Sequence, residues 1–108
     1  MSDIKDLQSR ALEIRRRYEE LETKRNGKAW TSTEIAMGFA VDVGELVEII
    51  MAKEGLRALD DVDAKLKHEL ADCLWCVFVL ANKYGVDIEQ SFLDTMNELD
   101  KRLDGAGA

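Results

Sequence analysis

The sequence predicts an all-α protein, specifically a four-helix bundle, from three observations. Apolar residues recur at intervals of three and four through each long segment, as they do on one face of a helix. The chain contains no proline, and its seven glycines fall mostly between these segments. Hydrophobic residues make up 46% of the 108 positions and charged residues 34%, which suits one helical domain with a modest core. We expect residues 1–104 to form that domain and 105–108 to be a disordered tail.

The first helix is expected from about Ser2 to Arg25, and Asn26 with Gly27 provides its stop signal. Its apolar stripe consists of Ile4, Leu7, Ala11, Ile14, Tyr18 and Leu21. The second helix is expected to begin at Thr31, where Glu34 completes a capping-box pattern. It should end near Glu54, before Gly55.

Residues 55–62 read as a connector, followed by a third helix from about Asp63 to Tyr84. The fourth helix is expected to begin at Asp87, where Gln90 again fits a capping box. Its apolar stripe consists of Phe92, Met96, Leu99 and Leu103. Four helices joined by short connections predict a bundle.

The apolar residues on all sides of the third predicted helix indicate that a second chain covers it. Between Leu70 and Ala81 only Asp72 is polar, and a helix that is apolar all round is buried all round. The second helix also carries Met37, Val41 and Met51 away from its core stripe. We therefore expect an obligate homo-oligomer, a dimer or a tetramer, with the second and third helices at the interface.

The charge and the chain's beginning limit the function classes. A net charge of −7 argues against a duplex nucleic-acid partner, since such surfaces are basic. The polar start MSDIKDLQSR resembles no signal peptide, and the longest apolar run, 74–81, is too short to span a bilayer. We expect a cytoplasmic protein without a membrane partner. Cys73 and Cys76 form a CxxC pair inside a helix and read as core thiols, with a redox or metal role as the alternative.

Acidic residues in apolar surroundings are the most informative feature of the chain. Asp42, Glu45 and Glu48 occur on the second predicted helix, and Glu69 and Asp72 on the third. Acids three apart share a helix face, and partly buried carboxylates are costly unless something pairs with them. A divalent cation with oxygen ligands is a suitable partner, which predicts Mg²⁺, with Mn²⁺ possible, and through it a phosphate substrate.

Three other readings compete with a hard-cation site. The acids could form a solvated face, which explains Glu69 and Asp72 poorly, or they could pair with an arginine of the first helix, Arg15, Arg16 or Arg17. A carboxylate-bridged di-iron site needs Glu-x-x-His. His68, the single histidine, directly precedes Glu69, so the di-iron reading fails.

From about Trp30 to Leu103 the chain resembles the all-α NTP pyrophosphohydrolases, the MazG-like superfamily. The resemblance is carried by FAVDVGELVEII, by HELADCLWCVFVLANKYGVDIEQSF and by the paired E-x-x-E and E-x-x-D motifs. It implies a dimer or tetramer that hydrolyses nucleoside or deoxynucleoside triphosphates between the α and β phosphates, giving a monophosphate and pyrophosphate.

The resemblance permits two registers for the first motif. Glu45 and Glu48 match it literally, whereas the family's E-V-G-E-L aligns with Asp42 to Leu46. Helical phase favours the second, because Asp42 and Glu45 flank the core stripe. The predicted metal ligands are therefore Asp42, Glu45, Glu69 and Asp72. Glu48 would be a further ligand or would orient the attacking water, and Glu45 or Glu48 would accept the proton from that water.

The chain departs from the family in three places. Asp42 replaces the usual Glu, and Cys76 stands where many relatives have Tyr. In the last helix, the family's K-M-x-x-N-x-x-R retains only Arg102 of its three polar positions. These departures favour an alternative: a catalytically weak nucleotide-binding or regulatory helical oligomer. A purely structural oligomer whose acids pair with arginine is a third reading.

The predicted substrate contacts each have a plainer reading. Trp30 would stack on a base, or would pack on Ile35 as a hydrophobic staple. Trp75 reads as core or interface. Lys53 and Arg57 would receive phosphates, Asn82 would bind a base and Arg102 the substrate, whereas the plainer reading for such cations is a solvated surface.

Overall fold

The computed structural model describes residues 3–107 and confirms the all-α prediction. Its helices are α1 (Ile4–Asn26), α2 (Ser32–Lys53), α3 (Val62–Lys83) and α4 (Ile88–Ala106), and the described residues contain no strand. None of these helices is long and apolar enough to cross a membrane. The predicted start at Ser2 and the last tail residue, Ala108, lie outside the described residues.

Local hydrogen bonds explain where the helices begin. The Thr31 hydroxyl accepts from the Glu34 backbone N–H at 3.1 Å, and the Glu34 carboxylate accepts from the Thr31 N–H at 3.0 Å, so the predicted capping box is present. At Asp87 only the first of the two bonds forms, from the Gln90 N–H. A capping box at Asp3 and Asp6, which is not among the predicted ones, starts α1.

Helix ends agree with the predictions to within a few residues. Gly27 takes a positive φ of 80° after α1, a backbone conformation that glycine adopts without steric cost. The chain continues as helix beyond Leu103, and Gly107 donates its N–H back to the Leu103 carbonyl. Gly105 and Ala106 therefore belong to α4, although the sequence predicts a disordered tail from 105.

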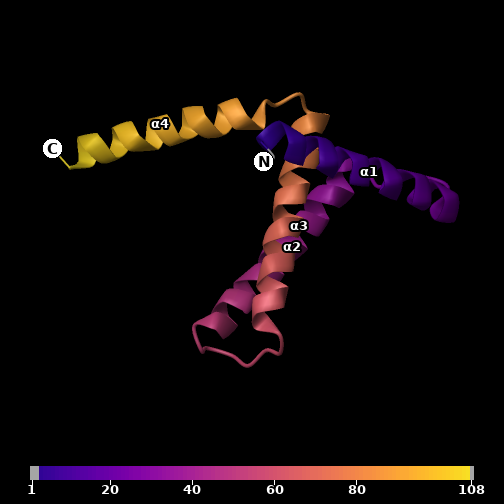
Figure 1. The fold of residues 1–108 in the computed structure, drawn as a ribbon, viewed down its shortest axis with the longest axis horizontal. Helices are drawn as coiled ribbons and strands as arrows, with labels where there is room; N and C mark the ends of the chain where they lie inside the picture. Colours follow the sequence, from indigo (N-terminus) through magenta and orange to yellow (C-terminus); the bar gives the residue numbers. More distant parts are fainter. Residues whose placement is uncertain (1–2, 108) are drawn as a thin grey trace.

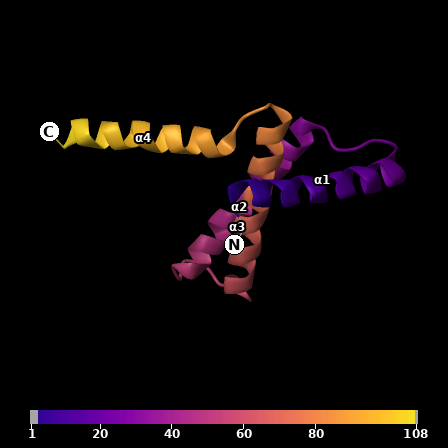
Figure 2. The same ribbon diagram turned by 45° about the horizontal axis from the view of Figure 1, so that its top comes forward.

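Helices α2 and α3 form an antiparallel hairpin, and α1 crosses it near the open end (Figures 1 and 2). Helix α3 packs against both α2 and α1. Helix α4 leaves the end of the hairpin and projects away from it, which gives the chain a longest dimension of 58 Å. The prediction of a four-helix bundle is therefore wrong for the single chain, because α4 does not close against α1–α3.

The core lies where α1, α2 and α3 meet. Ile35, Cys76 and Val79 are buried there, and Phe39, Trp75 and Leu80 pack against them. Cys76 is thus a core thiol, as predicted, and both cysteines are free.

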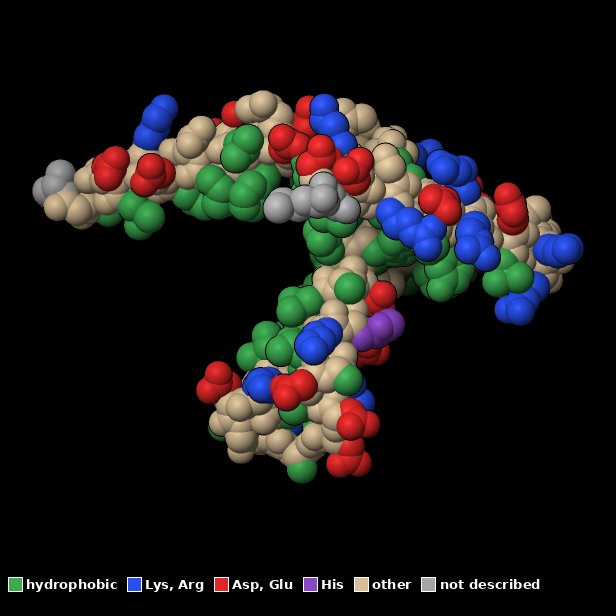
Figure 3. All heavy atoms as spheres, in the orientation of Figure 1, with side chains coloured by type: hydrophobic (Ala, Val, Ile, Leu, Met, Phe, Trp, Pro, Cys, Tyr) green, Lys and Arg blue, Asp and Glu red, His purple; other side chains and the backbone are tan. Residues whose placement is uncertain are grey.

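The hairpin and α4 leave much apolar surface uncovered (Figure 3). Hydrophobic side chains gather along one flank of the hairpin and beneath α4. Met37 on α2 is 64% exposed, Leu70 on α3 is 50% exposed and Leu103 on α4 is 71% exposed. None of the described α4 residues is buried. Exposed apolar patches of this kind mark interaction surfaces.

Replacing Thr31 by Ala should lower the free energy of unfolding by about 1 kcal/mol, because the Glu34 N–H loses its acceptor. Chemical denaturation monitored by circular dichroism measures the change. Thr31→Ser keeps the hydroxyl and should remain close to wild type. Equal destabilisation by both substitutions would contradict the capping role.

Candidate metal centre and adjoining cavities

Three of the predicted ligands converge where α2 packs against α3. Asp42 lies on α2, while Glu69 and Asp72 lie three residues apart on α3 and so share a helix face. One carboxylate oxygen from each residue lies within 4.8 Å of the other two. We call Asp42, Glu69 and Asp72 the carboxylate trio.

Glu69 is the buried member of the trio. Only 7% of the residue is exposed, and its Oε1 atom is fully buried without a hydrogen-bond partner among the described residues. Burial, reinforced by the neighbouring carboxylates of Asp42 and Glu45, raises the pKa of Glu69 to about 7. A buried hydrogen-bond acceptor without a partner destabilises the folded protein. Of the atoms in the described chain, the Glu69 Oε1 therefore fits the role of a cation ligand best.

The chemistry of the donors suits a hard cation. The trio offers only carboxylate oxygens, which Mg²⁺ and Mn²⁺ prefer. The Cys76 thiol contacts the Asp42 carboxylate with an Sγ to Oδ2 distance of 4.0 Å. Burial and the nearby Asp42 charge raise the pKa of Cys76 to about 11, so it stays a neutral thiol.

The arginines of α1 do not neutralise the trio. Arg15 pairs with Glu19 and Glu22 of its own helix. Among the described residues, no ion pair joins a lysine or arginine to Asp42 or Glu69, and Asp72 contacts His68 with an Nε2 to Oδ2 distance of 3.0 Å. The alternative reading requires ion pairs between arginine and these acids, and none forms among residues 3–107.

Glu45 and Glu48 lie on the hairpin-loop side of the trio. Both line a cavity of about 610 Å³ that also reaches Lys65, His68 and Glu69. Glu45 is close enough for its charge to raise the pKa of Glu69, but it is not one of the three converging residues. Glu48 forms an ion pair with Arg57 at 3.4 Å. Helical phase distinguishes Glu48 from Asp42 in the same way, but it groups Glu45 with Asp42, whereas here Glu45 shares a cavity with Glu48.

A second cavity, of about 300 Å³, adjoins the trio on the other side. Asp42 and Asp72 belong to its wall, and Trp30, a predicted substrate contact, lines it together with Tyr18 and Trp75. The Tyr18 and Trp75 rings meet edge to face with centroids 6.1 Å apart. We call this space the aromatic cavity.

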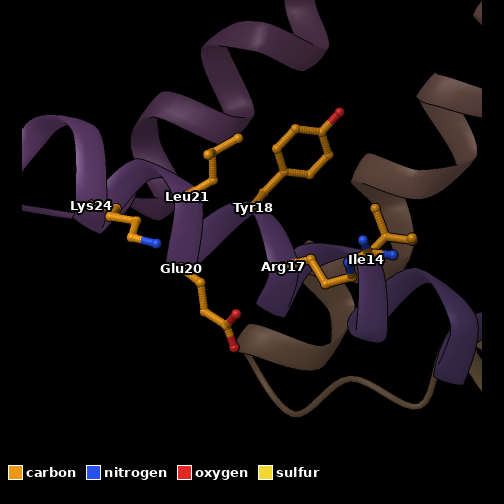
Figure 4. A pocket seen from close by; sticks show the side chains of 6 residues that line it. All are labelled: Ile14, Arg17, Tyr18, Glu20, Leu21 and Lys24. Carbon is orange, nitrogen blue, oxygen red and sulfur yellow. The ribbon is translucent and has the colours of Figure 1, made fainter.

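The sequence analysis missed Tyr18 and Trp75 as cavity residues. Tyr18 belongs to the apolar stripe of the first predicted helix and Trp75 to the apolar run 70–81, so nothing in the pattern separates them from ordinary core positions. Tyr18 also borders an open hollow along α1, lined by Arg17, Glu20 and Lys24 among others (Figure 4). That hollow contains a single acidic group, Glu20, and offers no cluster of metal ligands.

The other predicted substrate contacts lie apart from the trio. The Lys53 ammonium contacts Asp63 at 2.7 Å, and this pairing raises the lysine's pKa. Asn82 is exposed near the end of α3, and Arg102 is exposed on the projecting α4. None of these three residues lines either cavity beside the trio. Their roles stay predictions.

Comparison with known proteins identifies the family. A model of the MazG nucleotide pyrophosphohydrolase domain matches residues 31–105. The chain belongs to this family. The match spans α2, α3 and nearly all of α4, and therefore includes the trio, whereas α1 and Trp30 precede it. No curated protein and no solved structure matched the chain.

In the metal-free protein, the stability contributed by Glu69 should fall as pH rises from about 4.5 to about 7. The unfolded carboxyl loses its proton near its ordinary pKa of 4.5, whereas the folded one keeps it until about pH 7. The folded state binds more protons in that window, so rising pH favours unfolding.

Urea denaturation in a chelator across this pH window measures the effect. Glu69→Gln, which cannot ionise, should give a shallower decline than wild type. Glu98→Gln makes the same change at an exposed position of α4 and should follow wild type. Identical slopes for wild type and Glu69→Gln would contradict the prediction.

Proposed function

We propose that this MazG-family protein is a Mg²⁺-dependent nucleotide pyrophosphohydrolase. It would hydrolyse a nucleoside or deoxynucleoside triphosphate to a monophosphate and pyrophosphate. The observation that carries the proposal is the buried, unpartnered Glu69 oxygen beside the carboxylates of Asp42 and Asp72. Three carboxylates that converge between α2 and α3, one of them buried, are explained best in a nucleotide pyrophosphohydrolase domain by a bound cation.

Asp42, Glu69 and Asp72 would hold the cation, with Glu45 as a fourth ligand. When bound, Mg²⁺ supplies neutralisation of the phosphate oxygens and a lowered pKa for an attacking water. Glu45 or Glu48 would accept the proton of that water, because both face the cavity on the hairpin-loop side of Glu69. Arg57, which pairs with Glu48, would help to hold phosphate at the same end.

The runner-up is a catalytically weak nucleotide-binding or regulatory protein. It is favoured by the last helix, where Thr95 and Leu99 stand in place of the family's substrate-holding Lys and Asn. The exposed position of Arg102 on the projecting α4 favours it too. Pyrophosphate release from a panel of nucleoside triphosphates with Mg²⁺ separates the two, since binding without turnover would favour the runner-up.

We also propose that the protein is a homodimer or homotetramer in which α2 and α3 face a second chain. The support is the apolar surface left on these helices: Met37, Val41 and Leu70 are each at least half exposed. The single-chain core is small for four helices, with seven buried hydrophobic residues among those described. A second copy would bury much of this surface.

Glu69→Gln and Asp72→Asn should abolish Mg²⁺-dependent pyrophosphate release. Loss of an outer-shell partner alone reduces metal affinity or activity about 10- to 100-fold, so loss of a ligand should exceed this. Both variants should also lose the thermal stabilisation that Mg²⁺ or Mn²⁺ gives by mass action.

Glu98→Gln is the matched control and should retain both properties. Full activity in either ligand variant would refute the assignment. An unchanged melting temperature of wild type with added metal would favour the structural oligomer instead.

Sedimentation at micromolar concentration should show a dimer or a tetramer. Met37→Glu should shift the protein toward monomer, because it places a charge on the apolar flank of α2. Lys24→Glu, at an exposed position of α1, should not. A monomeric wild-type protein would contradict the proposal.

A further inference from the structure

The aromatic cavity has the position and size for one ring system. Its wall includes Asp42 and Asp72, so a molecule held at the carboxylate trio would border it directly. Its volume of about 300 Å³ is at the lower end for small-molecule sites. Tyr18, Trp30 and Trp75 supply three rings around it, and aromatic faces stack on any base.

Two side chains of α1 hold the Trp30 backbone in place. The Trp30 N–H donates to the Glu22 carboxylate at 2.8 Å, and the Arg15 guanidinium donates to the Trp30 carbonyl at 2.6 Å. Arg15 and Glu22 also pair with each other at 3.4 Å, and their side chains are only 12% and 15% exposed. The entry to α2 is therefore fixed by a largely buried ion pair.

Trp75 is also held in place by α1. Its indole N–H donates to the Ala11 carbonyl of α1 at 3.0 Å. This bond satisfies the polar atom of the ring, so what Trp75 offers the cavity is apolar. Walls that are held before a ligand arrives reduce the entropy lost on binding.

Gly38 is the one position in this wall without a side chain. A Cβ added there would meet only Trp30, with its Cζ3 atom 3.5 Å away, which is ordinary contact. Glycine destabilises a helix interior relative to alanine, and Gly38 lies inside α2 with no positive φ that would require it.

We propose that the aromatic cavity receives the base of the nucleotide and that Gly38 sets the size of the ring that enters. The proposal rests on the nucleotide function given above and specifies which residues read the substrate. Arg15 and Glu22 line the same cavity. Both hydrogen-bond to the backbone of Trp30, and neither forms a hydrogen bond or ion pair with the carboxylate trio among the described residues, so we assign them as positioning residues.

Gly38→Leu tests the cavity, and Gly44→Leu is its matched control. Both add the same side chain to α2, but a Cβ at Gly44 meets nothing within 4 Å. The probes are nucleoside triphosphates with purine and pyrimidine bases, and inorganic triphosphate, which carries the phosphates without a base. The chain's two tryptophans both line the cavity, so quenching of their fluorescence reports base binding without requiring turnover.

Gly38→Leu should weaken nucleotide binding about ten-fold, the scale of a lost base stack, and should leave inorganic triphosphate within about two-fold. Gly38→Ala, which the geometry tolerates, should weaken binding of purine nucleotides more than of pyrimidine nucleotides. Gly44→Leu should keep the wild-type ratio between nucleotide and inorganic triphosphate. Arg15→Ala should raise KM for the nucleotide with little change in kcat.

Two outcomes would overturn the inference. One is that Gly38→Leu and Gly38→Ala bind every nucleotide as wild type does. The other is an equal loss of nucleotide and inorganic triphosphate, which would indicate general damage near the trio. If Gly38→Leu does not fold, as judged by circular dichroism, Gly38→Ala with the same panel decides.

The test also separates this inference from the proposed function. Base-dependent quenching without pyrophosphate release from wild type would refute the hydrolase and leave the cavity assignment standing. Pyrophosphate release with unchanged base preference in both Gly38 variants would support the hydrolase and refute the cavity assignment.

Discussion

The packing of α2 against α3 is the constraint on which the rest of the structure depends. It buries Glu69 beside Asp42, although like charges at short range repel and buried carboxylates lose their hydration. The raised pKa of Glu69 and its unpartnered oxygen are consequences of this unfavourable burial. A hairpin of two apolar helices would fold more easily with hydrophobic residues at these positions. The acids are therefore best understood as a site whose stability depends on what binds there.

Helix α1 turns this pair of acidic helices into a shaped cavity. Its Arg15 and Glu22 fix the chain where it enters α2, and its Ala11 carbonyl fixes the Trp75 indole. These contacts use polar groups of α1 that a periodicity analysis assigns to solvent. They also place an aromatic wall within reach of the carboxylates, on the side opposite Glu45 and Glu48. Charged side chains line the cavities on both sides of the trio, but only the cavity on the α1 side has tyrosine and tryptophan in its wall.

Helix α4 and the apolar flank of the hairpin have no partner within the described chain. Their apolar stripes have the helical period expected of core-facing helices, yet they are exposed in the single chain. An apolar stripe in the sequence predicts that one face of a helix will be buried, but it does not indicate whether that face packs against the same chain or a second one. The error of predicting a closed bundle and the proposal of a homo-oligomer therefore come from the same observation.

The sequence alone determined the four helices, the capping box at Thr31 and the candidate acids on α2 and α3, because periodicity, capping and like-charge spacing act over a few residues. Helical phase also distinguished Asp42 from Glu48, and in the structure Asp42 belongs to the trio whereas Glu48 pairs with Arg57. Only the tertiary structure decided that Glu45 adjoins the trio, that Arg57 pairs with Glu48, and that Tyr18 and Trp75 share a cavity with Trp30. Those relations join residues on different helices, and their distances depend on crossing angles that no local pattern encodes.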